Sequence, residues 1–252
     1  MDKELQGKAA LVTGASRGIG AAAAIALARQ GVTRLTLQYN LNRQGAEATI
    51  AAVRSEGAEA DAIQADLGDI AGVRGFLEAI RGREFDILVN NAGSLVKRAR
   101  LPEFTEELYD RVMTLNLKSA WMIAHAVAPA MIARGSGIIV NVSSIAGRNG
   151  GGPGATIYSA AKAAVTAMTK GMAKELAPLG VRVNAVSPGT VDNYFHEQFS
   201  TREILDNVVK ATPAGRLGSN EELADAIVFL ASRASRFIYG QTIEVNGGML
   251  MV

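Results

Sequence analysis

A tyrosine and a lysine four positions apart, Tyr158 and Lys162, are the side chains best placed to do chemistry. If the chain is helical from Ile157 onward, both side chains lie on one helix face, so a phenol and an ammonium can share one small site. A free tyrosine keeps its proton up to about pH 10, and a neighbouring cation favours the phenolate and lowers this pKa. Ser144, beside a glycine-rich loop, can hydrogen-bond the same substrate oxygen. The group predicts proton transfer at that oxygen, and the alternative is a surface tyrosine near a solvated lysine.

A glycine-rich turn near the start of the chain indicates where a nucleotide could bind. Residues 9–14 are a short apolar run typical of a buried strand, and residues 18–31 have the pattern of a helix closed by glycine. Gly14, Gly18 and Gly20 stand where the strand turns into the helix. A Cβ atom there would block the approach of a pyrophosphate to the amides and the dipole of the helix N-terminus. The turn predicts a dinucleotide site, and a tight glycine turn without a ligand is the alternative.

Strand and helix patterns alternate along the rest of the chain. The predicted strands are 9–14, 34–39, 59–64, 86–90, 137–143, 181–187 and 241–245. The predicted helices include one that ends near residue 56, one over about 69–81, a long one from the cap at Thr105 through Met131 with an interruption near Pro129, the Tyr158 helix, and one from the capping box of Ser219 and Glu222 to about Ser232. Repeated strand–helix units predict an α/β fold, a doubly wound parallel sheet of about seven strands with helices on both faces. The predicted ligand crevice lies beyond the carboxyl ends of these strands.

Composition excludes several classes of protein. The chain has 252 residues, of which 48% are apolar, and no low-complexity linker, so we expect one domain over residues 1–252. It contains no cysteine, which fits a reducing, cytoplasmic location and excludes disulfides and zinc fingers. The charged N-terminal segment and the short longest apolar run predict neither a secretory signal nor a membrane span. A net charge of +2 argues against a nucleic-acid partner, and no cluster of histidines or carboxylates predicts a metal site.

The ordered set of motifs resembles the short-chain dehydrogenase/reductase family over nearly the whole chain. The motifs are TGASRGIG, the NNAG of residues 90–93, Asn116, Ser144, Tyr158 with Lys162, the SPG of residues 187–189 and the C-terminal GRLG and EVNGG. Each motif is weak or moderate alone, whereas the set in this order is specific. The resemblance implies a single Rossmann domain that exchanges hydride between a nicotinamide cofactor and a ketone or secondary alcohol.

The resemblance also implies a catalytic tetrad of Asn116, Ser144, Tyr158 and Lys162. In it Tyr158 transfers the proton, Ser144 holds the reacting oxygen, Lys162 bonds the nicotinamide ribose and favours the phenolate, and Asn116 positions a water. Two fixed hydroxyl donors suit the negative charge that hydride addition builds on a carbonyl oxygen. Two alternatives stay open: Asn116 could merely cap or kink its helix, and Ser143 rather than Ser144 could face the site.

The end of the second predicted strand indicates which nicotinamide is used. Folds that bind NAD commonly place an acid there, but this chain has Tyr39 and Asn40, with Arg17 in the glycine turn and Arg43 shortly after. An arginine can bind a 2′-phosphate in bidentate fashion, so we predict NADP(H); the alternative is that both arginines are ordinary surface charges. By resemblance, Asp66 bonds the adenine amino group. The full set of expected cofactor contacts is Gly14, Ser16, Arg17, Gly18, Ile19, Gly20, Asn40, Arg43, Asp66, Leu67, Asn91, Ala92, Gly93, Tyr158, Lys162, Pro188, Gly189 and Val191.

Three segments are expected to set substrate specificity: a lid over about 191–212, a flexible wall at 148–154 and a basic rim at 94–101. Similar reductases of β-ketoacyl groups on acyl carrier protein carry an arginine where this chain has Leu179, so a carrier partner is only weakly supported, although Lys97, Arg98 and Arg100 could substitute. The alternatives are a free ketone or a sugar or other secondary alcohol. The family often has threonine at Asn193, so that cofactor contact is in doubt, and His196 is expected to be solvated.

Two further expectations concern activity and assembly. A non-catalytic NADP-binding sensor or scaffold is a remote alternative, because all four tetrad residues are present. The helices predicted around residues 120–133 and 157–176 are apolar on more than one face, and the tail GGMLMV is apolar too. Such surfaces favour packing between subunits, and the resemblance implies a homotetramer; the alternative is that they belong to the core of a single chain.

Overall fold

The computed structural model describes residues 4–252, so residues 1–3 of the charged N-terminal segment lie outside the described residues. Its centre is one sheet of seven strands in which every neighbouring pair is parallel. Across the sheet the order is β3 (Glu59–Gln64), β2 (Arg34–Tyr39), β1 (Ala9–Val12), β4 (Ile87–Asn90), β5 (Gly137–Val142), β6 (Val181–Pro188) and β7 (Thr242–Val245). The predicted doubly wound parallel sheet is therefore confirmed.

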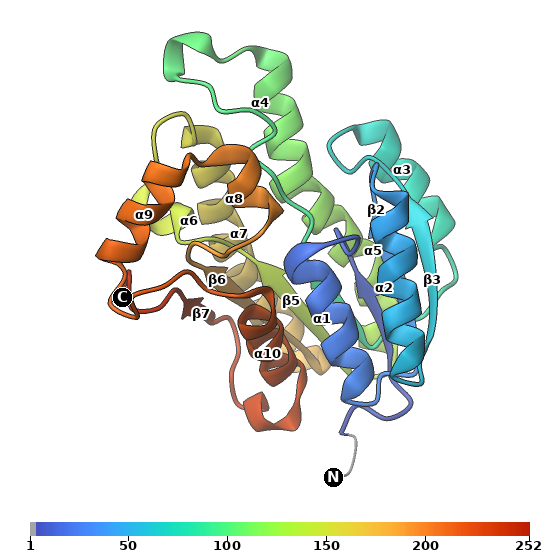
Figure 1. Cartoon of the computed structure of the whole chain (residues 1–252). Helices are drawn as coiled ribbons and strands as arrows, with labels where there is room; N and C mark the ends of the chain where they lie inside the picture. Colours follow the sequence, from blue (N-terminus) through green and yellow to red (C-terminus); the bar gives the residue numbers. More distant parts are fainter. Residues whose placement is uncertain (1–3) are drawn as a thin grey trace.

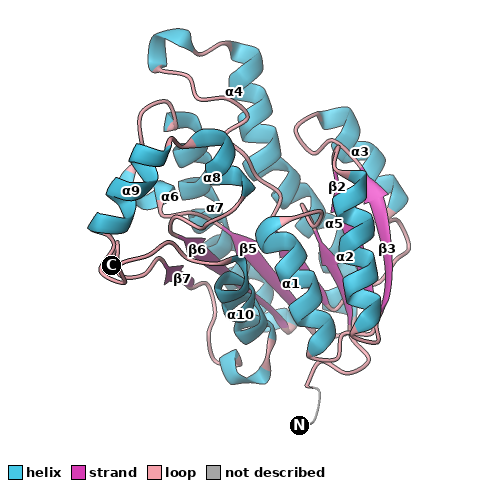
Figure 2. Cartoon of the chain, in the orientation of Figure 1, coloured by secondary structure: helices cyan, strands magenta, loops and turns pink. Residues whose placement is uncertain are grey.

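Helices cover both faces of this sheet (Figures 1 and 2). One face carries α1 (Gly18–Arg29), α2 (Arg43–Ser55) and α10 (Asn220–Ala231). The other face carries α3 (Ile70–Ala79), α4 (Glu106–Met113), α5 (Ser119–Ala133) and α7 (Thr156–Leu176). The remaining helices are α6 (Ala146–Asn149), α8 (Tyr194–Phe199), α9 (Arg202–Ala211) and the short turns η1 (Leu101–Glu103), η2 (Thr114–Lys118), η3 (Ala177–Leu179) and η4 (Arg233–Ser235). Right-handed crossovers between parallel strands place helices on both sides in this way.

Two apolar cores follow from the alternation of side chains along each strand. In β1, Ala10 and Val12 pack with α1 and α10, while Leu11 between them packs with α3 and α5. All three are buried, as a strand covered on both faces requires. The sheet is thereby fixed as a rigid platform whose carboxyl edge carries the loops.

The long helix expected from Thr105 to Met131 is broken at a different place from the one predicted. Thr105 caps α4 as expected, accepting a hydrogen bond from the Leu108 amide at 3.2 Å. The interruption near Pro129 is wrong, because α5 continues through that proline. The break is the π-helical turn η2, where the Asn116 side chain donates to the Val112 carbonyl at 2.8 Å and so occupies an acceptor of the helix.

The cap expected further along the chain is present: Ser219 and Glu222 form the reciprocal capping box of α10. Over residues 4–252, no helix combines the length and the apolarity needed to cross a bilayer. The same residues bring together no group of three or more histidine, aspartate or glutamate side chains that could hold a metal ion.

Candidate active site

A cavity of about 750 Å³ opens at the carboxyl edge of the sheet. The glycine turn, the ends of β2, β4, β5 and β6, helix α7 and the segment 188–208 all contribute to its wall. The predicted site residues that line it are Gly14, Ser16, Arg17, Gly18, Ile19, Asn40, Asp66, Leu67, Asn91, Ala92, Gly93, Ser144, Tyr158, Lys162, Pro188, Gly189 and Val191. Gly20, Arg43 and Asn116 do not line it.

The glycine turn has the geometry that a dinucleotide requires. Gly14 and Gly18 have φ values of 65° and 60°, which favour glycine. A Cβ on Gly14 would lie 2.9 Å from the Cα of Ala92. No side chain caps the first turn of α1, so its amides are available to an anion. Gly20 is needed for packing, because a Cβ there would meet the Gly14 carbonyl oxygen at 2.4 Å.

Hydrogen bonds from neighbouring strands hold this turn. The Asn91 amide donates to the carbonyls of Thr13 and Gly14 at 2.9 and 3.1 Å. The Thr13 hydroxyl in turn accepts from the backbone amides of Asn91 and Ala92, each at 3.0 Å. Gln38, buried at the end of β2, accepts from the Gly14 amide at 2.8 Å. Asn91 thus shapes the floor of the cavity, and sequence reasoning missed Thr13 and Gln38 because their partners lie on other strands.

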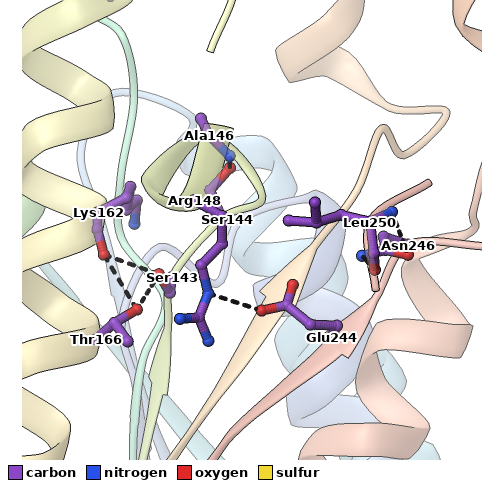
Figure 3. A network of polar contacts seen from close by, with 9 residues as sticks. All are labelled: Ser143, Ser144, Ala146, Arg148, Lys162, Thr166, Glu244, Asn246 and Leu250. Carbon is purple, nitrogen blue, oxygen red and sulfur yellow. Dashed lines mark hydrogen bonds and ion pairs between the residues drawn. The ribbon is translucent and has the colours of Figure 1, made fainter. Parts of the chain in front are cut away.

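Lys162 is buried in the floor of the cavity. Its ammonium donates to the Val142 carbonyl at 2.8 Å. Its backbone carbonyl accepts from the Ser143 hydroxyl at 2.8 Å (Figure 3). Ser143 also contacts the Thr166 hydroxyl at 3.0 Å, so this serine ties β5 to α7. Burial lowers the pKa of Lys162 to about 8. The amine therefore remains largely protonated at neutral pH.

Tyr158 and Ser144 meet in the cavity wall, one turn of α7 away from Lys162. Burial raises the pKa of Tyr158 to about 12, and hydrogen bonding with Ser144 opposes this rise. The expectation that Lys162 lowers this pKa is wrong for the structure: the ammonium lies 5.7 Å from the ring centroid and its hydrogen bond goes to Val142. The phenol is therefore protonated at neutral pH, as a proton donor must be. The geometry favours Ser144 over Ser143, whose hydroxyl is engaged behind the wall.

Asn116 sits beside Lys162 without reaching the cavity. Its amide bonds the backbone of Ser94 on both sides, accepting from the amide at 3.1 Å and donating to the carbonyl at 2.8 Å. A Cβ on Gly93 would lie 2.8 Å from the Asn116 Oδ1 and 2.9 Å from the Lys162 Nζ. The alternative that Asn116 kinks its helix is therefore partly right, and the same side chain also lies near Lys162.

The two arginines expected at a 2′-phosphate differ in placement. Arg17 lines the cavity, and its guanidinium carbon lies 3.9 Å from the centre of the Tyr194 ring. Arg43 points elsewhere and pairs with Glu47 at 2.8 Å. Asp66, expected to bond the adenine amino group, lines the cavity and pairs with Arg111 at 2.8 Å, a partner that sequence reasoning missed.

A second missed feature joins the Ser144 segment to the last strand. Arg148 in α6 and Glu244 in β7 form an ion pair at 2.9 Å, with side chains that are 26% and 13% exposed (Figure 3). The other Glu244 oxygen is buried without a hydrogen bond. The two residues are far apart in sequence, so no local sequence pattern predicts the ion pair.

The expected lid folds as α8 and α9 (Figure 1), and residues of both helices line the cavity. Asn193 caps α8 and donates to Asn220 at 3.0 Å. Phe195 lies 5.8 Å from the Tyr158 ring, centroid to centroid. His196, expected to be solvated, is instead partly buried; burial and the charge of Arg98 lower its pKa to about 4 against an opposing effect of Asp192.

Together the parallel sheet, the open helix N-terminus at the glycine turn and the hydroxyl pair define a dinucleotide-binding oxidoreductase of the Rossmann class. A family model described as enoyl-(acyl carrier protein) reductase matches residues 14–250. The chain belongs to the short-chain dehydrogenase/reductase family, and it is an oxidoreductase that uses a nicotinamide dinucleotide to act on alcohol and carbonyl groups.

Relatives within this family differ in substrate and cofactor. The 3-oxoacyl-[acyl-carrier-protein] reductase FabG of Staphylococcus aureus (strain Mu50) is 37% identical over 246 residues, covering 97% of this chain and 98% of its own. A gluconate 5-dehydrogenase from Burkholderia cenocepacia, solved with NADP and tartrate, has a TM-score of 0.88 and 37% identity over 98% of this chain and 97% of its own. The NADH-dependent reductase A1-R′, solved with NAD, has a TM-score of 0.86 and 33% identity over the whole of both chains.

Proposed function

We propose that the protein is an NADP(H)-dependent carbonyl reductase that interconverts a ketone and a secondary alcohol, with Asn116, Ser144, Tyr158 and Lys162 as its catalytic set. One observation carries the proposal: the phenol of Tyr158 and the hydroxyl of Ser144 share the wall of the cavity into which the glycine turn opens. The bound nicotinamide supplies the hydride. Tyr158 gives its proton to the carbonyl oxygen while Ser144 donates a hydrogen bond to it.

Lys162 acts in this scheme as a buried positive charge behind Tyr158. Its ammonium is fixed by the Val142 carbonyl, so it is held in place before any ligand binds. By resemblance to the family, this ammonium would bond the hydroxyls of the nicotinamide ribose. Asn116 serves as a positioning residue, because it holds the Ser94 backbone next to Gly93 and Lys162.

The preference for NADP(H) rests on Arg17. This side chain lies in the cavity wall, and no carboxylate follows β2 before Glu47. An acid at that place would repel a 2′-phosphate, and a guanidinium attracts it. Arg43 contributes less, because it is already paired with Glu47 and lies outside the cavity.

Two substrate classes follow from the relatives, and the geometry favours one of them. A carrier-bound 3-oxoacyl group, the substrate named for the FabG relative, needs a basic docking surface for the acidic carrier. Leu179 stands at one expected basic position, and Arg134 near the other is engaged with the Phe85 carbonyl at 2.7 Å and Glu84 at 3.1 Å. A free small ketone or a sugar-type alcohol, as in the gluconate relative, is therefore the preferred substrate.

A homotetramer is part of the proposal. Trp121 on α5 is 51% exposed, and Phe237 beside the end of α10 is 96% exposed. The C-terminal Met251 and Val252 are exposed as well. Large apolar side chains on several separate surfaces suit contacts with further copies of the chain.

The test follows NADPH oxidation with a panel of ketones. The wild type should reduce at least one of them, and Tyr158→Phe should lower kcat by about 10³-fold while NADPH binding stays unchanged. Tyr109→Phe is the matched control, since this tyrosine is 45% exposed on α4 and lies outside the cavity. A Tyr158→Phe protein as active as the wild type would contradict the proposal and favour the alternative of a non-catalytic NADP-binding sensor or scaffold.

A further inference from the structure

Near Tyr158 and the lid the cavity wall is largely apolar, and its positive groups include Arg98 and the buried ammonium of Lys162. Its apolar side chains include Leu95, Ile145, Phe195, Phe199, Val208 and Met249. Among the described residues, the cavity's one carboxylate is Asp66, which is paired with Arg111 at the end expected to hold the adenine. The part of the cavity near Tyr158 and the lid is thus apolar except for the Arg98 guanidinium, the Lys162 ammonium that is bound to the Val142 carbonyl, and a few neutral polar groups.

Arg98 is held rigidly by two backbone carbonyls. Its Nε donates to the Phe199 carbonyl at 2.7 Å and its Nη1 to the Pro153 carbonyl at 2.8 Å. A guanidinium has five N–H donors, so three remain. Within residues 4–252, no carboxylate forms an ion pair with Arg98. A cation fixed in this way is preorganised to bind an anion, because little side-chain entropy remains to be lost.

A strained turn brings Arg98 to this place. Val96 has a φ of 63°, which is unfavourable for a β-branched residue, and the Lys97 amide closes a tight turn on the Leu95 carbonyl at 2.7 Å. The Val96 amide donates to the Ser94 hydroxyl at 2.9 Å, which fixes the turn to the segment beside Asn116. The chain therefore reverses just before Arg98. This segment connects the backbone beside Asn116 to the lid.

The lid histidine lies close enough to Arg98 to be affected by its charge. His196 lines the cavity, and the charge of Arg98 adds to burial in lowering its pKa. The imidazole is neutral at physiological pH, so it adds no further cation. Among the described residues no carboxylate lines this region, so a carboxylate entering it meets the Arg98 guanidinium without a repelling neighbour.

We propose that Arg98 binds the carboxylate of the substrate, and that the protein acts on small oxo acids and the corresponding hydroxy acids. The proposal rests on the proposed function, since it names the substrate class of the same site. The ketone reacts at Tyr158 and Ser144, and the carboxylate pairs with the guanidinium between the lid and the 148–154 wall. A neutral ketone, or an acyl thioester on a carrier, leaves Arg98 without this partner.

The test compares oxo acids, with the carboxylate at graded distances from the ketone, to their methyl esters. The wild type should prefer at least one acid, and Arg98→Met should lower the acid-to-ester ratio of kcat/KM by about 10- to 100-fold, mainly through KM. Arg98→Lys should keep part of the preference because it keeps a charge. Lys97→Met is the matched control: it removes a neighbouring cation outside the cavity wall and should leave the ratio unchanged.

Inhibition by malonate gives a second measurement, since malonate carries carboxylates but no ketone or carbinol. Malonate should compete with a methyl ester in the wild type, and its inhibition constant should rise about tenfold in Arg98→Met. If Arg98→Met only displaces the lid, acids and esters should react more slowly by the same factor, and the acid-to-ester ratio of kcat/KM should stay unchanged. That result would overturn the proposal. Faster reduction of a neutral ketone or of acetoacetyl carrier protein than of every acid would overturn it too, with the proposed function intact. Ketone reduction that survives Tyr158→Phe would instead overturn the proposed function.

Discussion

The lid and the floor of the cavity enclose the same space, yet they are held by different kinds of interaction. We count as the floor both the lining residues opposite the lid and the side chains packed directly behind them. On the floor, Lys162, Ser143 and Asn116 are buried and bound to backbone groups of β5, α7 and the 93–94 segment. In the lid, neither α8 nor α9 has a buried residue. The lid contacts the rest through the Arg17–Tyr194 stack, the Arg98 bond to Phe199 and packing of Phe195 against Tyr158.

This difference suits the floor to proton transfer and the lid to the entry and selection of substrate. Proton transfer needs atoms fixed to within a fraction of an ångström, which a packed floor provides. Entry and release of ligands need a segment that opens at small free-energy cost, and such segments have few buried contacts. Val191 and Thr212, at the two ends of the lid, are buried, so the segment is anchored at its ends and held between them by a few surface contacts.

The largest effect on stability is expected at the ion pair between α6 and β7. Arg148→Met leaves Glu244, which is 13% exposed, without its partner and should lower the free energy of unfolding by about 2 kcal/mol. Arg43→Met is the matched control, because its pair with Glu47 is exposed and its loss should hardly change that free energy. Urea unfolding at one protein concentration measures both. Equal losses would remove the contrast between braced and exposed regions.

The second prediction uses the pH dependence of the floor. The pKa of Lys162 is about 8 in the folded chain and 10.5 when unperturbed, so the unfolded state binds more protons between these values. Stability therefore rises with pH in this window, and Lys162 contributes a gain of about 2 kcal/mol from about pH 7.5 to about pH 9.5. The raised pKa of Tyr158 acts in the opposite direction only above pH 10.

Lys162→Met supplies the comparison. The free energy of unfolding of the wild type minus that of the variant should increase by about 2 kcal/mol from about pH 7.5 to about pH 9.5. A constant difference would mean that Lys162 is not desolvated, and the floor would then be less closed than the structure shows.

A smaller effect is expected where the lid meets the cofactor site. Arg17→Ser should weaken NADPH binding by about tenfold and leave NADH binding almost unchanged, because only the charge-assisted bonds to a 2′-phosphate are lost. Arg43→Ser should change NADPH binding less than about threefold, since an exposed, already paired charge contributes little. Fluorescence titration measures each dissociation constant. A larger loss with Arg43 would reverse the assignment of the two arginines.

The smallest effect concerns the lid itself. Tyr194→Ala removes the stacking partner of Arg17, an interaction of about 0.5–1 kcal/mol at an exposed site. Limited proteolysis within 194–211 should become faster, while the midpoint of global urea unfolding hardly moves. Tyr109→Ala, which removes an exposed tyrosine from α4, should change neither. Unfolding that shifts as much as proteolysis would show that the lid and the floor open as one unit.

The sequence predicted the floor better than the lid. Tyr158, Lys162 and the glycine turn lie in short motifs whose spacing already implies their geometry, and the alternation of strands and helices predicted the sheet. Arg98 could be placed only in a basic rim, because its position depends on the Val96 turn and on two distant carbonyls. The raised pKa of Tyr158 was missed for a related reason: burial is a property of the packed chain, whereas the nearby lysine is visible in the sequence.

The most direct test follows a single turnover of enzyme-bound NADPH in light and heavy water. For the wild type, oxidation of the cofactor should be slower in heavy water, because the proton of Tyr158 moves as the carbonyl is reduced. For Tyr158→Phe, the same step should be about 10³-fold slower with cofactor binding unchanged. A variant that oxidises NADPH at the rate of the wild type would contradict the assignment of Tyr158 as the proton donor.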